Sequence, residues 1–261
     1  MITTHHVPGT PCWLDLGAPD VERAADFYRS VFGWEAESPA SEDYVLFRLH
    51  GKVVAAIGKL TEQGARSAWM VYFNTPDADA TTAAVQRLGG TVRIQPVEPM
   101  AGGGKMAQVS DPQGAQFAIF EAGADRGLQL VDDPGGLMWL ELYTTDAAAA
   151  KEFYGTLFNW EYEDILMPDG GGTYSMIGPA GQGQERMLGG LMELEAADLP
   201  GGRPYWHPVF HVENCDTVVN SVTGHGGNVQ MGPEDAAGVG RLAVCNDQAN
   251  AEFVVLTPSP M

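Results

Sequence analysis

The chain has 261 residues, 44% of them hydrophobic, and a formal net charge of −20 from 34 acidic and 14 basic residues. So acidic a surface repels phosphate backbones and anionic lipid headgroups, which argues against binding to nucleic acid or to a membrane. No apolar run approaches the roughly 18 residues that span a bilayer, and Met1–Pro8 has neither the basic nor the apolar part of a signal peptide. We expect a cytoplasmic protein.

The cysteines support the same compartment. Cys12, Cys215 and Cys245 are odd in number, far apart, and form no C-x-x-C pair. This pattern is typical of a reducing environment and argues against a disulfide framework or a thiolate zinc site. We expect buried, inert thiols.

The first predicted elements are a strand at 13–18, whose residues alternate between two faces, and a helix that Asp20 caps and Gly33 ends. Short strands follow around 44–50 and 53–60. A second strand at 69–74 and an alanine-rich helix come next. Two closing strands, at 106–109 and 116–120, flank an Asp-Pro-Gln-Gly turn.

The same elements then return. Trp13 and its neighbours recur from Trp139 at a constant shift of 126 residues, and 10 of the 23 positions from 13 to 35 are identical, where about one or two would match by chance. The strand at 69–74 recurs at 206–211, and closing strands recur at 242–245 and 252–256. We therefore predict two domains, at 8–122 and 137–258, joined by a linker at 123–136 rich in Gly and Asp.

This order of strand, capped helix with Phe-Tyr and Phe-x-Trp, Gly-Gly and Asp-Pro-x-Gly turn resembles the vicinal oxygen chelate superfamily, which includes glyoxalase I, bleomycin-resistance proteins and extradiol dioxygenases. The resemblance covers nearly the whole chain and is closest to two-domain glyoxalase-like proteins. It implies an α+β fold in which each domain contains two βαβββ modules. The modules would form a curved open sheet, or bowl, with the helices outside.

In catalytic members of the superfamily, His, Gln or Glu on the first and last strand of each module binds a metal. The resemblance transfers these positions to Trp13, Met70, Trp139, His207, Ala118 and Val254. Glu193 is a further candidate on a strand that cannot be aligned securely. Indole, thioether and aliphatic groups cannot hold a hard divalent ion, and a working site needs three or four N or O ligands. We therefore expect no metal and no cofactor.

Strand alternation predicts which other side chains face each bowl. The first bowl would bind a ligand with Trp13, Asp15, Met70, Tyr72, Asn74 and Gln116. The second would bind it with Trp139, Tyr143 and Val209. Its candidate catalytic residues are Glu141, His207, His211 and Glu252. The indoles of Trp13 and Trp139 could stack on a planar ligand or simply fill the bowl.

The second set has three interpretations. In the first, Glu141 or Glu252 takes a proton and a histidine returns one, because imidazole titrates near neutral pH and burial raises the pKa of a carboxyl group. In the second, Glu141, His207 and Glu252 form a displaced metal site. In the third, these groups only hydrogen-bond to one another or to loop backbone, in a bowl that does no chemistry. Elsewhere, we expect Trp34 and Trp160 in the core and His5-His6 in a mobile terminus.

These expectations define a metal-independent glyoxalase-like protein that binds a small, partly aromatic or apolar metabolite. It could act as a cofactor-free isomerase, lyase or cyclase. One alternative is a non-catalytic protein that sequesters an antibiotic or metabolite, as bleomycin-resistance proteins do. A second alternative is a metal-dependent glyoxalase-type lyase or extradiol dioxygenase. The expected partner is a small molecule, and the chain would be a monomer or a homodimer.

Overall fold

The computed structural model describes residues 1–41, 43–62, 64–99, 102–123, 127–167 and 171–259. Within them, the elements of the first half are β1 (Pro11–Ala18), α1 (Val21–Phe32), β2 (Glu35–Ser41), β3 (Tyr44–Leu49), β4 (Lys52–Lys59), β5 (Ala68–Asn74), α2 (Ala78–Arg87), β6 (Thr91–Val97), β7 (Gly104–Ser110) and β8 (Gln116–Ala122). Those of the second half are β9 (Leu137–Thr144), α3 (Ala147–Phe158), β10 (Trp160–Leu166), β11 (Thr173–Pro179), β12 (Gly189–Glu193), β13 (Tyr205–His211), α4 (Cys215–Gly224), β14 (Asn228–Ala236), β15 (Gly240–Asn246) and β16 (Glu252–Pro258).

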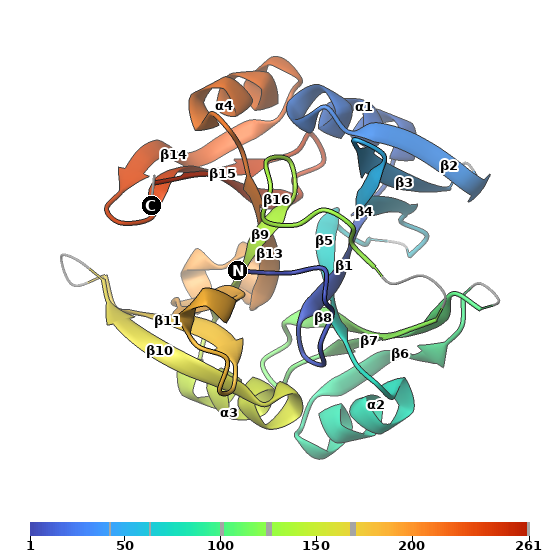
Figure 1. The fold of residues 1–261 in the computed structure, drawn as a ribbon, viewed down its shortest axis with the longest axis vertical. Helices are drawn as coiled ribbons and strands as arrows, with labels where there is room; N and C mark the ends of the chain where they lie inside the picture. Colours follow the sequence, from blue (N-terminus) through green and yellow to red (C-terminus); the bar gives the residue numbers. More distant parts are fainter. Residues whose placement is uncertain (42, 63, 100–101, 124–126, 168–170, 260–261) are drawn as a thin grey trace. The chain divides into compact units, whose positions relative to one another are not determined.

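Each half forms one curved, unclosed sheet of eight described strands (Figure 1). The strand orders are β2-β3-β4-β1-β5-β8-β7-β6 and β10-β11-β12-β9-β13-β16-β15-β14. In each module the first strand pairs in parallel with the last, as β1 does with β4 and β13 with β16. The predicted α+β tandem of four βαβββ modules is confirmed.

The helices begin and end where the local chemistry predicts. The side chain of the residue before each helix accepts a hydrogen bond from the backbone N–H three positions on, which satisfies an otherwise free helix donor. These capping residues are Asp20, Asp77, Asp146 and Asn214. Gly33 and Asn159 end α1 and α3 in the left-handed conformation, at φ 72° and 56°.

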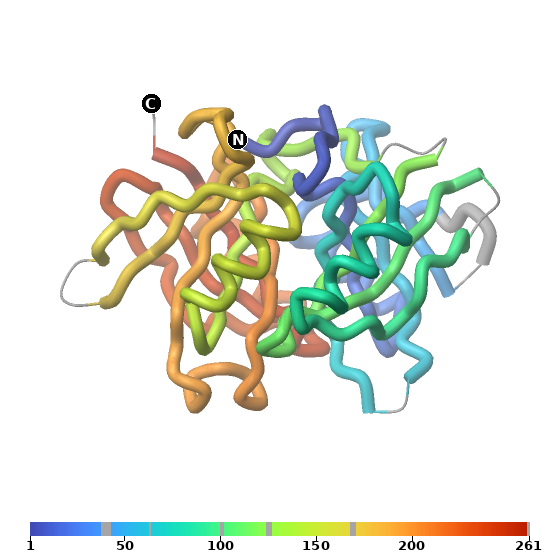
Figure 2. Tube along the Cα trace, turned by 90° about the horizontal axis from the view of Figure 1, so that it is seen from below, coloured from blue at the N-terminus to red at the C-terminus, as the bar shows by residue number. Residues whose placement is uncertain are grey.

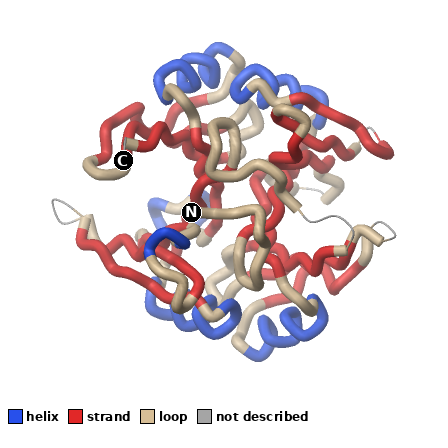
Figure 3. Tube along the Cα trace, in the orientation of Figure 1, coloured by secondary structure: helices blue, strands red, loops and turns tan. Residues whose placement is uncertain are grey.

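The chain divides into two compact units, and each unit combines modules from both halves. We name the units by the order of their modules along the chain: the inner unit holds the second and third modules, and the outer unit holds the first and fourth. The inner unit contains Met1–Trp13, Val71–Gly127 and Trp139–Trp206. The outer unit contains Leu14–Met70, Leu128–Met138 and His207–Met261. Helices α2 and α3 pack together in the inner unit (Figure 2), and α1 and α4 pack together in the outer unit (Figure 3). The domain limits 8–122 and 137–258 therefore remain a prediction.

Aromatic side chains fill the space between helices and strands in both units. In the inner unit they are Phe73, Phe117, Phe153, Tyr154, Phe158, Trp160 and Trp206. In the outer unit they are Phe27, Tyr28, Phe32, Trp34, Phe47, Trp69, Phe210 and Phe253. Trp34 and Trp160 are 0% and 5% exposed, so their predicted place in the core is confirmed.

The end of the predicted linker is a second copy of the N-terminal segment. The indole N–H of Trp34 donates to the carbonyl of Gly135 at 2.8 Å, and that of Trp160 donates to Gly9 at 2.8 Å. Gly9 and Gly135 are again 126 residues apart. Each half thus supplies the tryptophan that binds the segment preceding the other half. The N-terminal segment is also packed in the inner unit, because Ile2 is 4% exposed and the carbonyl of His6 accepts from Asn74.

No helix among the residues described above is both long enough and apolar enough to cross a bilayer.

Candidate functional site

The open face of β9 in the inner unit carries a carboxyl group between two aromatic side chains. Trp139, Glu141 and Tyr143 alternate along the strand and are each half-buried. Leu140 and Leu142 point to the opposite face and are 0% exposed, against the helix side of the sheet. This alternation follows from the two-residue period of a strand that has one buried face.

A chain of hydrogen bonds joins these residues to Tyr174 of β11. The indole Nε1 of Trp139 donates to Tyr174 Oη at 2.8 Å, and Tyr174 Oη donates to Glu141 Oε1 at 2.9 Å. Tyr143 Oη donates to Glu141 Oε2 at 3.4 Å. Burial and the neighbouring charge of Glu141 raise the pKa of Tyr174 well above its ordinary value. Tyr174 therefore stays a neutral phenol that donates to the carboxyl group of Glu141.

Gly190 makes room for this arrangement. It lies beside Glu141 in the parallel pairing of β12 with β9. A Cβ atom at position 190 would lie 1.9 Å from Tyr174 Oη, so only glycine allows the phenol to lie against the strand backbone. A further aromatic side chain, Tyr205, completes this face, with its ring centroid 5.6 Å from that of Tyr143 in an edge-on arrangement.

Sequence reasoning missed Tyr174 and Tyr205. Tyr205 lies two residues before His207 on the same strand, so alternation alone could have found it. Tyr174 occupies the place in β11 that Tyr44 occupies in β3, and this equivalence was a usable signal.

In the outer unit, His207 and Glu252 lie together. His207 Nδ1 is 3.2 Å from Glu252 Oε1, and the His207 side chain is 1% exposed. This contact falls outside hydrogen-bond geometry, and it is an ion pair only when the imidazole is protonated. The amide of Gln230 donates to Glu252 Oε2 at 2.8 Å and also to Asn246 Oδ1. Glu252 is therefore held in place by an amide and faces a buried imidazole.

Other predicted residues of the outer unit have local partners. His211 Nδ1 lies 2.8 Å from the carbonyl oxygen of Asp132, and so fastens the end of the linker to β13. Val209 is 3% exposed. Tyr44 Oη donates to Asp15 Oδ1 at 3.0 Å on the open face of β1 and β3. Met70 is half-buried on β5.

The predicted first-bowl residues of the inner unit are largely engaged with their neighbours. Asn74 donates to the carbonyl of His6 at 2.7 Å, the same contact that His211 makes with Asp132. Gln116 is exposed and accepts from Arg93. Tyr72 is 3% exposed, and Trp13 is half-buried.

Five of the six side chains at the superfamily's metal positions do not fit a metal, and the sixth, His207, lies against Glu252. Trp13, Met70, Ala118, Trp139 and Val254 offer no donor to a hard cation. Across the described ranges, no group of three or more His, Cys, Asp or Glu side chains is arranged to hold a metal ion.

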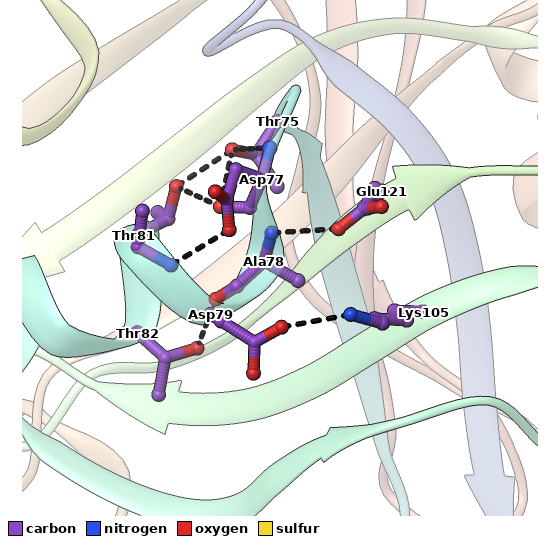
Figure 4. A network of polar contacts seen from close by, with 9 residues as sticks. Thr75, Asp77, Ala78, Asp79, Thr81, Thr82, Lys105 and Glu121 are labelled. Carbon is purple, nitrogen blue, oxygen red and sulfur yellow. Dashed lines mark hydrogen bonds and ion pairs between the residues drawn. The ribbon is translucent and has the colours of Figure 1, made fainter.

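Glu193, the remaining candidate, caps a helix. Its Oε2 accepts from the backbone N–H of Ala147, at the start of α3, at 2.7 Å. Glu121 does the same for Ala78, at the start of α2, at 2.9 Å (Figure 4). The polar network in that figure, which also includes the Lys105–Asp79 ion pair at 2.8 Å, therefore serves the helix N-terminus.

A separate hollow of about 620 Å³ lies near the start of α3, and Glu193 is the predicted candidate that lines it. Its walls come from Thr145, Gly171, Gly172, Glu193, Leu194, Glu195, Ala196 and Asp198.

Four βαβββ modules on two open sheets define a two-domain glyoxalase-like protein. The chain belongs to the glyoxalase/bleomycin resistance protein/dioxygenase superfamily, whose family matches residues 131–255, while a glyoxalase-like domain family matches residues 13–120. Anthracycline biosynthesis protein DnrV of Streptomyces peucetius is 34% identical over 270 residues, which cover 97% of this chain and 94% of that protein. CFP32 of Mycobacterium tuberculosis is 32% identical over 259 residues, covering 97% and 96%.

Solved structures share the fold at low identity. The 2,3-dioxygenase LapB from Pseudomonas sp. KL28 has a TM-score of 0.68 and 16% identity, covering 98% of this chain and 94% of that chain. The Mn(II)-bound glyoxalase from Novosphingobium aromaticivorans has a TM-score of 0.66 and 16% identity, covering 96% and 82%. At such identity the likeness establishes the fold alone.

Proposed function

We propose that this protein binds a small, partly aromatic or apolar organic molecule on the open face of β9, and that Glu141 acts on it as an acid–base group without a metal. The observation that carries the proposal is the hydrogen-bond chain from Trp139 through Tyr174 to Glu141, with Tyr143 as a second donor. It holds one carboxylate in a defined position among half-buried aromatic rings.

The surroundings suit a flat ligand. Trp139, Tyr143 and Tyr205 present aromatic surface that remains partly accessible. Aromatic rings contribute large apolar area and favour offset or edge-on contact with a second ring. A ligand that lies on these rings would bring a polar or acidic group within reach of Glu141.

The relatives point the same way. Two proteins that are 34% identical to this chain are named for anthracycline biosynthesis, and anthracyclines are polycyclic aromatic molecules. A ligand with fused rings would match the size and flatness of the β9 face.

The acid–base role follows from the chemistry of the two phenols. Tyr174 and Tyr143 donate to the carboxylate and stabilise its charge, so Glu141 is the proton acceptor of the group. A base of this kind takes a proton from carbon next to a carbonyl, which is the first step of many isomerase, lyase and cyclase reactions.

His207 and Glu252 are proposed as a second proton-transferring pair, in the outer unit. An imidazole beside a carboxylate can pass a proton to it, and His207 Nδ1 lies next to Glu252 Oε1. The corresponding residues of the first half, Met70 and Gln116, cannot exchange protons. Any such chemistry therefore belongs to the second half. His211, fastened to Asp132, is the weakest of the predicted catalytic residues.

Two probes test the proposal. The first is 2-naphthol, whose binding is measured by calorimetry. We expect Trp139→Ala to weaken binding about tenfold, because a stacked ring is lost, whereas the exposed Glu161→Gln should bind as the wild type does. The absence of any 2-naphthol binding would contradict the ligand site.

The second probe is 2-tetralone in D2O, whose α-hydrogen exchange is followed by NMR. Glu141 would take the α-proton to leave the enolate, and a deuteron from solvent would replace it. We expect Glu141→Gln to bind the ketone but to exchange it at least about 100-fold more slowly. If the wild type binds the ketone and exchanges it no faster than buffer does, the protein is a sequestering binder instead. One equivalent of metal in untagged protein with an exchange rate that chelation abolishes would favour the metal-dependent alternative.

A further inference from the structure

The pair formed by Glu141 and Tyr174 has a counterpart in the outer unit. Tyr44 Oη donates to Asp15 Oδ1 at 3.0 Å, and Tyr174 Oη donates to Glu141 Oε1 at 2.9 Å. Asp15 and Glu141 are related by the 126-residue shift. Both tyrosines come from the third strand of their module and reach across the fourth strand, and all four side chains are half-buried. The two halves therefore present the same phenol–carboxylate contact on an open face.

We propose that Asp15 and Tyr44 form a second ligand site, so that each chain binds two small molecules of unequal kind. This inference rests on the proposed function, because it assumes that the Glu141–Tyr174 pair marks a ligand site. A hydroxyl or N–H group of the ligand would donate to Asp15, which also accepts from Tyr44.

The walls of the two sites differ at two positions where the second half has a tyrosine. Gly17 stands where the second half has Tyr143, and Ala68 stands where it has Tyr205. The first site thus lacks both rings of the edge-on pair. Leu60 covers Gly17 instead, since a Cβ atom at position 17 would lie 2.7 Å from its side chain.

Toward β4 and β3, the other neighbours of Asp15 in the outer unit are aliphatic. Ala56 pairs with Asp15 in the parallel pairing of β1 with β4, and Leu46 pairs with Ala56 in turn. Residues paired in this way share one face of the sheet, so Leu46 and Asp15 lie on the same side. Leu46, Leu60 and Met70 are all half-buried and therefore partly accessible.

These walls predict different ligand preferences. The aromatic site of the second half favours a flat ring. The site of the first half lacks two of the rings of the second site and has aliphatic side chains instead. Their apolar contacts are non-directional, so this site admits a saturated, puckered ring more readily. Both sites would prefer a ligand with a hydroxyl group, because each presents a carboxylate.

Calorimetric titration of the full chain with 2-naphthol and with its saturated counterpart, decahydro-2-naphthol, tests the inference. We expect two equivalents of 2-naphthol to bind in a tight and a weak step. Glu141→Gln should weaken the tight step about tenfold and Asp15→Asn the weak step about tenfold, because each removes a charged acceptor. Decahydro-2-naphthol should bind in one step that only Asp15→Asn weakens.

Glu22→Gln on the exposed side of α1 is the matched control for the first half and should change neither step. Thermal melts check that each variant is folded. A second variant adds an aromatic side chain to the first site instead of removing a charge from it. Ala68→Tyr restores the ring that Tyr205 supplies in the second half, and we expect it to tighten the weak step for 2-naphthol.

One equivalent of 2-naphthol that Glu141→Gln weakens and Asp15→Asn leaves unchanged would overturn this inference and keep the proposed function. No binding of either probe would overturn both.

Discussion

Tyr154 Oη donates to Asp111 Oδ2 at 3.1 Å in the core of the inner unit. Tyr154 lies on α3 of the second half, and Asp111 opens the turn before β8 of the first half. The outer unit contains the reciprocal contact, in which Tyr28 Oη donates to Asp247 Oδ2 at 3.3 Å. In each half, the tyrosine of the first helix therefore donates a hydrogen bond to the turn aspartate of the other half. The Phe-Tyr motif and the Asp turn are separate in the sequence, but the tyrosine of the one donates to the aspartate of the other.

Loss of this hydroxyl should destabilise the protein. Tyr154→Phe removes the donor to Asp111 Oδ2 and the acceptor of the Trp206 indole N–H, which lies 2.9 Å away. We expect a loss of about 1–3 kcal/mol in the free energy of unfolding, because buried polar groups lose their partner. Urea denaturation measures it. Tyr28→Phe should cost a similar amount, and a midpoint equal to that of the wild type would contradict the contact.

The turn aspartates should make stability depend on pH. Burial raises the pKa of Asp111 and of Asp247, although backbone N–H groups and the tyrosines partly oppose the shift. The folded protein thus binds their protons more tightly than the unfolded chain does. Stability is therefore highest below the unfolded pKa of about 4 and falls as pH rises through the raised folded value.

Asp111→Asn isolates this effect, because it keeps the Oδ1 acceptor of the turn and cannot ionise. We expect its free energy of unfolding to decline less than that of the wild type as the pH rises from about 4. Urea titrations across this range give the comparison. A wild type that gains stability relative to the variant with rising pH would show that the sign is wrong.

Gly190 should be intolerant of substitution. Gly190→Ala places a methyl group 1.9 Å from Tyr174 Oη, so the phenol must leave Trp139 and Glu141. We expect a loss of about 1–3 kcal/mol of stability from overpacking and a changed near-ultraviolet circular dichroism spectrum. Gly224→Ala is the control, because no atom lies within 4 Å of its Cβ position and alanine suits a helix. Equal behaviour of the two variants would contradict the packing of Tyr174.

The three thiols should be unreactive in the folded protein. Burial raises the pKa of Cys245 to about 12 and of Cys215 to about 11, and it raises that of Cys12 further. The reactive thiolate is therefore scarce at pH 8. We expect less than one equivalent to react with Ellman's reagent at pH 8 before unfolding and three equivalents in urea. Rapid reaction of a thiol in the native protein would show that it is accessible.

Much of the candidate site could be predicted from the second half alone. The two-residue period of β9 placed Trp139, Glu141 and Tyr143 on one face, and their burial follows that pattern. Tyr174 could not be placed in this way. It reaches Glu141 from β11 across β12, and its position depends on the missing Cβ of Gly190.

Similarly, the repeat could not show that Glu193 caps α3, because its strand offered no secure alignment. The contact depends on where β12 ends relative to the helix N-terminus, and that is set by the parallel pairing of β12 with β9.

Local chemistry, then, was sufficient for the repeat, the capped helices, the alternating strands and the family, because each is encoded within one turn or one strand of contiguous residues. Which helix packs on which was decided only by the tertiary structure. α1 packs with α4, and α2 with α3. The tyrosine–aspartate contacts likewise join residues as far apart as Tyr28 of α1 and Asp247 of the turn before β16. Such pairings arise from the burial of apolar surface, which is non-directional. The sequence pattern of a helix therefore shows that it has an apolar face but not which element covers that face.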